Sequence, residues 1–248
     1  MLLNPSKTEA VIFGTRVQRE KIDTTTGIDV AGAIVPFSES VKLLGVNLDA
    51  TLSLDRYVSD VVRSCNFHTR ALRHIRPSLN LAASKMIAQG IVSARFDYCN
   101  SLLAGTSSSN FDRLQVAQNA LARAVCHAPW SSSATELRRL LHWLPVRQRV
   151  EFKLAAITYR TVQTNTPTYM ASLINSYRPP RTLRSSDKLL LHQPLVKLAL
   201  ASKAFSVSAP YVWNTLPFNC RSASSVTVFK RLLKTELFNR AYGDTLPT

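Results

Sequence analysis

The chain has 248 residues, of which 46% are hydrophobic and 19% are charged. This content is sufficient for one or two packed domains and excludes a disordered tail. The formal net charge of +16 favours a polyanionic partner, such as nucleic acid or an anionic membrane surface, over the neutral substrate of a small-molecule enzyme.

The charge is unevenly distributed along the chain. Residues 1–62 carry six basic and eight acidic side chains, whereas residues 63–248 carry 25 basic and seven acidic ones. We therefore expect the surface that binds a polyanion to lie in the later part of the chain.

The first fifty residues are predicted to form strands and turns. Residues 9–13 are a short apolar run closed by Gly14, and residues 41–49 alternate as a strand with a bend at Gly45. A helical period follows from Leu54 to Ile75 and stops at Pro77.

Arginines recur on one face of this first long helix, at Arg56, Arg63 and Arg70, and Arg73 follows. They form either a solvated helix face or a set of phosphate contacts. Seven acidic residues are too few to neutralise 25 basic ones, so salt bridges alone do not explain these arginines.

Four further helices are predicted over residues 81–103, 110–126, 134–143 and 146–163. The helix at 110–126 opens with a capping-box-like Ser109-Asn110-Phe111-Asp112. The helix at 146–163 carries cations that are candidate phosphate contacts: Arg147, Arg149 and Lys153.

The last third of the chain is less regular. Residues 164–187 are rich in Pro, Ser, Tyr and Arg and are predicted to be a linker, and residues 189–218 are predicted to be partly extended. A final helix over 226–241 has an apolar face and a basic face, the latter formed by Lys230, Arg231 and Lys234. This basic face is either solvated or a further phosphate contact.

The sequence lacks the common enzyme motifs for nucleotide phosphates, zinc proteases and serine hydrolases. No Asp-Asp or Asp-x-Asp occurs that could hold two metal ions about 3.5 to 4 Å apart. Cys65 and His68 have the spacing of half a zinc site, but no second pair follows, so burial in a core is favoured. We predict no metal site in this chain.

Aromatic side chains offer a second route to nucleic acid, because bases stack on them. Trp143 and Trp213 lie among Leu, Pro and Val, which favours core packing over base stacking. The better stacking candidates are Tyr169, Tyr177 and the basic, proline-rich residues 178–181.

The compartment follows from what the sequence lacks. No apolar run approaches the roughly 18 to 20 residues of a membrane span, and the start has no signal-peptide pattern. The four cysteines form no C-x-x-C pair. We expect an intracellular protein of the nucleus or cytoplasm with no membrane partner.

Five stretches in order carry a resemblance that runs across nearly the whole chain. They are LNPSKTE at 3–9, LGVNLD at 44–49, LHWLPVR at 141–147, APYVWNTLP at 209–217 and FKRLLKT at 229–235. Together they resemble the reverse transcriptases (RNA-directed DNA polymerases) of non-LTR, LINE-type retrotransposons of the jockey-like group.

The resemblance implies three domains: the end of the palm at 1–52, a thumb-like helical domain at 53–130 that follows the template–primer duplex, and a C-terminal extension at 131–248. Lys7 would be the late-palm lysine that donates a proton to the departing pyrophosphate, although a solvated lysine in a turn is the simpler interpretation. Gly45, Val46 and Leu48 would form the hairpin that supports the primer end.

The metal-binding aspartates of this family would lie upstream of Met1, so the resemblance implies a C-terminal fragment that does not polymerise alone. Magnesium serves the intact family, and this chain is expected to hold no cofactor.

We expect a mainly α fold with a small β-rich N-terminal part, a thumb-like helical bundle and an α-rich, partly irregular C-terminal region. The expected nucleic-acid partner is RNA or an RNA/DNA hybrid. The missing palm or another protein is a further expected partner and would bind an exposed apolar face. The alternatives are a translated non-functional relic or a host-adopted helical interaction module.

Overall fold

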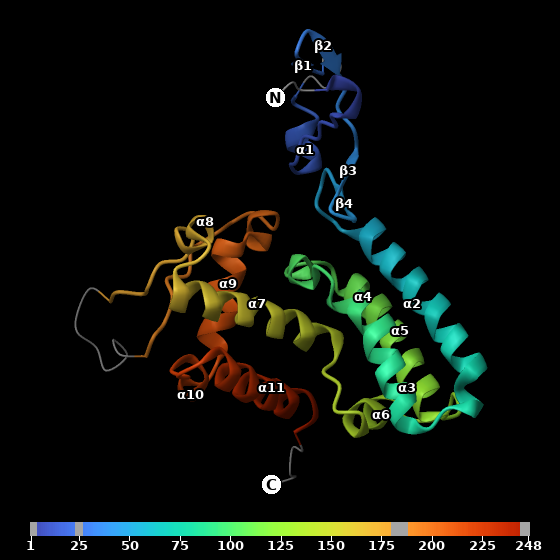
Figure 1. Cartoon of the computed structure of the whole chain (residues 1–248). Coiled ribbons are helices and arrows are strands. Elements are labelled where there is room, and N and C mark those ends of the chain that lie inside the picture. The colour runs from blue at the N-terminus through green and yellow to red at the C-terminus, as the bar shows by residue number, and fades with distance from the viewer. Residues whose placement is uncertain (1–3, 23–26, 180–187, 244–248) are drawn as a thin grey trace. The chain divides into compact units, whose positions relative to one another are not determined.

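A computed structural model of the chain describes residues 4–22, 27–179 and 188–243. The chain divides into two compact units, Met1–Asp60 and Val61–Thr248. Most described residues are helical, and the strands belong to the first unit, as expected for a mainly α chain with a small β-rich N-terminal part (Figure 1). Among the described residues, no helix has the length and apolarity to cross a membrane.

The first unit contains two antiparallel hairpins and two short helices, followed by the start of a long helix: η1 (Pro5–Lys7), α1 (Arg16–Arg19), β1 (Ile28–Val30) with β2 (Ala33–Val35), and β3 (Ser40–Leu43) with β4 (Val46–Asp49). The predicted single strand at 41–49 is therefore a hairpin. Its turn places Leu44 at φ 48° and Gly45 at φ 83°, which is the pair of positive φ angles that a tight two-residue hairpin turn requires. The predicted strand at 9–13 is wrong except for an isolated bridge between Ala10 and Phe37.

The long helix α2 (Asp55–Ile75) begins close to the predicted residue, Leu54. The Asp49 carboxylate fixes the backbone of the two residues that precede the helix. Asp49 accepts hydrogen bonds from the backbone amides of Ser53 at 2.9 Å and Leu54 at 2.8 Å. Burial raises the pKa of this carboxyl, but these bonds and one from Thr51 outweigh burial and leave the pKa below its usual value. The helix ends before Pro77, where a short 3₁₀ turn takes over.

Helices dominate the second unit. Their bounds are α3 (Leu81–Ile87), a π-helical segment η3 (Ala88–Ser93), α4 (Ala94–Asp97), η4 (Asn100–Leu103), α5 (Ser108–Cys126), α6 (Ala134–Leu140), α7 (Val146–Thr164), α8 (Thr168–Ala171), η5 (Ala201–Lys203), α9 (Phe205–Thr215), α10 (Phe218–Arg221) and α11 (Val226–Tyr242). The predictions for α6, α7 and α11 agree with these bounds to within a few residues.

Three predictions for this unit need correction. The helix expected over 81–103 contains a π-helical segment and breaks at Cys99, whose φ of 48° is left-handed. The helix expected from Asn110 begins at Ser108, because the Ser107 hydroxyl caps it by accepting from the Asn110 amide at 3.2 Å. The second half of the segment expected to be extended is instead helix α9, with Pro210 in its interior.

The main core of the second unit lies between α7, α9 and α11. Tyr159 of α7 stacks on Phe229 of α11 with ring centroids 4.2 Å apart, and Trp213 of α9 lies 6.0 Å from Phe229. The Trp213 Nε1 donates to the Leu189 carbonyl oxygen at 2.7 Å. Core packing of Trp213 is therefore confirmed, and Trp143 is buried as well.

Cys65 of α2 is fully buried, as the core interpretation of the Cys65–His68 spacing predicts. Burial raises the pKa of its thiol from about 9 to about 12. Because the folded pKa is the higher one, the neutral thiol's contribution to stability is present below pH 9 and is lost between pH 9 and 12. The thiolate is the nucleophile, so Cys65 in the folded chain should resist alkylation at pH 8.

We expect iodoacetamide to leave Cys65 unmodified in the folded chain and to modify it in guanidinium chloride. Mass spectrometry of the tryptic peptides measures both fractions. Equal rates of modification in the two samples would contradict the buried position of this thiol.

Candidate nucleic-acid interface

The predicted site residues fall in both units. Lys7 is exposed in η1, and Gly45, Val46 and Leu48 lie on the β3–β4 hairpin, with Gly45 in the turn, Val46 buried and Leu48 half-buried. Arg56, on the first turn of α2, also belongs to the first unit. The remaining predicted cations lie in the second unit.

Helix α2 carries three of these cations, Arg63, Arg70 and Arg73, all exposed. Arg70 donates from Nε to the carbonyl oxygen of Asn66 in its own helix, at 3.4 Å. The spacing of seven places Arg63 and Arg70 on one helix face, and Arg73 lies one turn further along. The three side chains therefore form an exposed basic row along α2.

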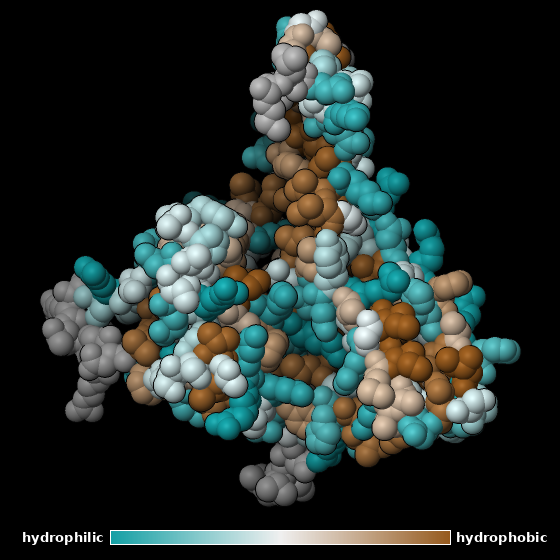
Figure 2. Space-filling model, viewed as in Figure 1, coloured by the Kyte–Doolittle hydropathy of each residue, from teal (hydrophilic) through white to brown (hydrophobic). Residues whose placement is uncertain are grey.

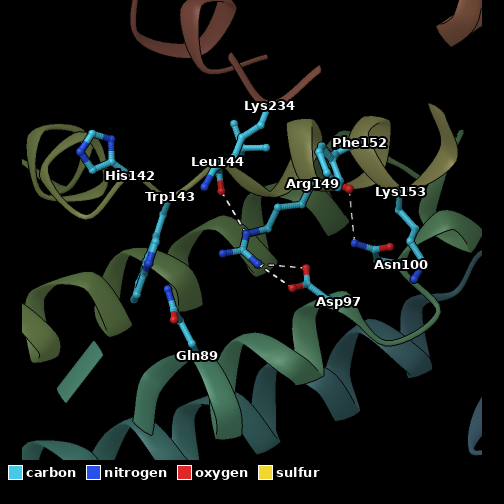
Figure 3. Close-up of a pocket in the computed structure, with 10 residues that line it drawn as sticks. All are labelled: Gln89, Asp97, Asn100, His142, Trp143, Leu144, Arg149, Phe152, Lys153 and Lys234. Atoms are coloured by element: carbon cyan, nitrogen blue, oxygen red, sulfur yellow. Dashed lines mark hydrogen bonds and ion pairs between the residues drawn. The ribbon is translucent and has the colours of Figure 1, made fainter. Parts of the chain in front are cut away.

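A second group of predicted cations meets at a cavity of about 370 Å³ in the second unit. Lys153 of α7 and Lys234 of α11 line it together with Arg149, although α11 is distant from α7 in the sequence (Figure 3). Both lysines are exposed. The tertiary structure therefore brings Lys153 and Lys234 to one place.

Arg149 already has partners inside the chain. Its Nη1 lies 2.9 and 2.8 Å from the two carboxylate oxygens of Asp97, and its Nε donates to the Leu144 carbonyl oxygen at 3.1 Å. The Arg149 side chain is only 15% exposed. This ion pair holds α4 against the start of α7, so phosphate contact by Arg149 would compete with a structural role.

Two buried polar atoms in the same cavity lack partners. Neither Trp143 Nε1 nor Asn100 Oδ1 has a hydrogen-bond partner among the described residues. Both side chains line the cavity, at opposite ends of the view in Figure 3. A buried polar group without a partner costs about 1–3 kcal/mol. Arg19, Thr69 and Arg221 also carry such atoms, and these three residues do not line this cavity.

The other predicted cations differ in their surroundings. Arg147 lies with its guanidinium carbon 4.3 Å from the centre of the Phe111 ring and donates to the Ser108 hydroxyl at 3.1 Å. Lys230 and Arg231 are exposed on α11 and are not among the residues that line the cavity.

Sequence analysis missed several residues of this surface. Asp97 and Asn100 carry no pattern that would have marked them, because their role depends on contacts with α7. Trp130 is 74% exposed beside Arg123, whose guanidinium carbon lies 4.6 Å from the ring centre. Its place between Pro129 and a run of serines was the available signal for an exposed aromatic residue.

Of the predicted stacking candidates, Tyr169 is 70% exposed and Tyr177 is 38% exposed. Arg178 is exposed as well, whereas Pro180 and Arg181 lie outside the described residues.

Apolar side chains are also exposed on α3 and α5. Figure 2 shows brown side chains over the part of its face formed by these helices. Met86 of α3 is 69% exposed and Val116 of α5 is 60% exposed.

Among the described residues, no group of three His, Cys, Asp or Glu side chains comes together that could hold a metal ion. The Cys65 Sγ lies 3.9 Å from the Val92 carbonyl oxygen, and the His68 Nε2 lies 2.8 Å from Arg95 Nη2.

Two curated proteins of Drosophila melanogaster are similar to the chain. It is 25% identical over 151 residues to the probable RNA-directed DNA polymerase from transposon BS, a match that covers 60% of the chain and 16% of that protein. It is 25% identical over 203 residues to the probable RNA-directed DNA polymerase from transposon X-element, covering 79% of the chain and 21% of that protein. No family model matches the chain. No solved structure matches it either.

These similarities confirm a relationship to the reverse transcriptases of retrotransposons. The chain spans about a fifth of the length of these relatives.

Proposed function

We propose that this chain is the end of the palm, the thumb and the C-terminal extension of a LINE-type, jockey-like reverse transcriptase, and that it binds the backbone of RNA or an RNA/DNA hybrid. Its relatives are RNA-directed DNA polymerases by name, which supports the nature of the partner. In this proposal the chain acts inside the cell, in the nucleus or cytoplasm, and contributes binding rather than polymerisation.

The observation that carries the proposal is the exposure of the cations in the second unit. Arg63, Arg70 and Arg73 of α2 and Lys153 of α7 are exposed, as are Lys230, Arg231 and Lys234 of α11. Residues 63–248 contain 25 basic and seven acidic side chains, and two of those acids, Asp97 and Glu236, already pair with Arg149 and Arg240. Such a surface releases counterions when it binds a phosphate backbone.

The test is the salt dependence of binding. If the chain contacts about five phosphates, the logarithm of the association constant should fall with the logarithm of salt concentration, with a slope of about −3.5 for single strands and −4.5 for duplexes. Fluorescence anisotropy of labelled RNA between 50 and 300 mM KCl measures this slope. A slope near zero at micromolar protein would overturn the proposal.

A second candidate function is an interaction module, or a relic without a selected function. Large exposed apolar side chains of the first unit favour it, because Ile34 of β2 is 64% exposed and Leu44 of the β3–β4 turn is 81% exposed. Such side chains suit docking on the palm or on another protein. Sedimentation of the chain as an aggregate, together with a slope near zero, would support this candidate instead.

A further inference from the structure

The turn between α5 and α6 presents Trp130 to solvent on an ordered backbone. The Ala128 amide donates to the Arg123 carbonyl oxygen at 3.0 Å, and the Ser132 amide donates to the Pro129 carbonyl oxygen at 3.1 Å. Trp130 lies between these two hydrogen bonds and is 74% exposed. A large aromatic side chain that is already held in place loses little conformational freedom when a partner binds to it.

Arg123 covers one face of the Trp130 ring. Its guanidinium carbon lies 4.6 Å from the ring centre, and its Nε and Nη2 donate to the Ser132 carbonyl oxygen at 3.2 and 3.1 Å. Because Trp130 is 74% exposed with one face covered, its opposite face is open to solvent. An open indole face backed by arginine is a surface on which a flat ring stacks.

The surroundings of this turn are cationic. Arg76, in the 3₁₀ turn η2 (Arg76–Ser78) that follows α2, donates from Nε to the Val125 carbonyl oxygen at 2.8 Å, so the basic row of α2 runs toward the end of α5. Residues 61–96 and 113–135 contain eight Lys or Arg side chains and no Asp or Glu. A nucleic-acid strand carries a row of anions together with flat rings, which favours it over a protein as the partner of the exposed indole.

We propose that Trp130 stacks on one unpaired base of an RNA strand whose phosphates lie along the basic row of α2. The inference rests on the proposed function and extends it from backbone binding to contact with a base. A base inside a duplex already has neighbours on both faces, whereas an unpaired base is free to stack on an aromatic side chain. Stacking reads no hydrogen-bonding edge, so the site should accept any of the four bases.

The first experiment separates contact with a base from contact with phosphates. We expect Trp130→Ala to weaken binding of a 12-nucleotide single-stranded RNA about tenfold, within the range for loss of one stacking aromatic side chain. A strand of the same length whose sugars carry no bases keeps the phosphates, and Trp130→Ala should weaken its binding by less than about twofold. Anisotropy of the whole chain at 0.1 M KCl measures both losses.

Two further variants control this comparison. Trp130→Phe keeps a flat ring and should retain most of the affinity for the strand with bases. Tyr211→Ala removes an aromatic side chain of α9 that is 61% exposed, and it should change neither affinity by more than about twofold. Circular dichroism checks that each variant keeps its helices.

The second experiment observes Trp130 directly. The other two tryptophans, Trp143 and Trp213, are 3% and 1% exposed, so a change in tryptophan emission on adding a strand reports mainly on Trp130. Stacking should quench this emission with the strand that carries bases and not with the base-free strand. Trp130→Phe should remove the quenching.

The outcomes separate this inference from the proposed function. Salt-dependent binding that Trp130→Ala leaves unchanged, or weakens equally for both strands, overturns the inference and leaves backbone binding intact. An unchanged affinity would leave the indole as a docking point for a protein. Absence of salt-dependent binding overturns both. A loss confined to the strand with bases, together with quenching by that strand alone, supports the inference.

Discussion

Replacing Arg70 and Arg73 together by glutamine is expected to weaken binding of single-stranded RNA about 25-fold at 0.1 M salt. Both side chains are exposed on α2, so the loss should come from phosphate contacts rather than from packing. Each contact with a single strand contributes about 0.7 to the salt slope, and the slope should therefore become shallower by about 1.4. Anisotropy titrations over a range of KCl concentrations measure both quantities.

The matched control removes two exposed cations from the first unit, by Arg16→Gln with Lys21→Gln. The first 62 residues carry more acidic than basic side chains, and Arg16 already pairs with Glu20 at 3.1 Å. This control should change affinity by less than about twofold. An equal loss in both double variants would mean that net charge, and not the α2 surface, governs binding.

Phe229→Ala is expected to lower the free energy of unfolding of the second unit by about 3–5 kcal/mol, the usual cost of removing a buried aromatic side chain. Phe229 has no exposed surface and stacks on Tyr159 of α7. Its loss would leave a hole in the core between α7, α9 and α11. Urea unfolding followed by circular dichroism at 222 nm measures the difference.

Phe218→Ala provides the control, because Phe218 of α10 is of the same type and is 51% exposed. We expect it to cost less than about 1 kcal/mol. If Phe229→Ala left the unfolding midpoint unchanged, the placement of α11 against α7 would be wrong.

Local signals in the sequence predicted much of the helical structure correctly. The period of apolar residues and the stop at Pro77 predicted α2, and the same period around Phe229 and Leu233 predicted α11. Such helices are visible from sequence because one face is buried along their whole length. The bend assigned to Gly45 was correct in place. The alternation of residues predicted one bent strand there, whereas the resemblance implied a hairpin, and the structure has the hairpin.

Helix α9 shows where local signals misled. Residues 189–218 were predicted to be partly extended, yet Phe205–Thr215 are helical, even though Pro210 in the helix interior removes a backbone donor. Ala209, Pro210 and Trp213 are buried in this helix, which packs on α7. Burial of these apolar side chains outweighs the local cost of the proline, and a single sequence does not reveal that contact.

The sequence by itself determined the basic character of residues 63–248, the relationship to the reverse transcriptases and the cations on the faces of α2, α7 and α11. Only the tertiary structure decided which of these cations share a site. It paired Arg149 with Asp97 and brought Lys153 and Lys234 to one cavity beside Asn100 and Trp143. The physical reason is that charge and periodicity are properties of neighbouring residues, whereas a cavity depends on how distant helices pack.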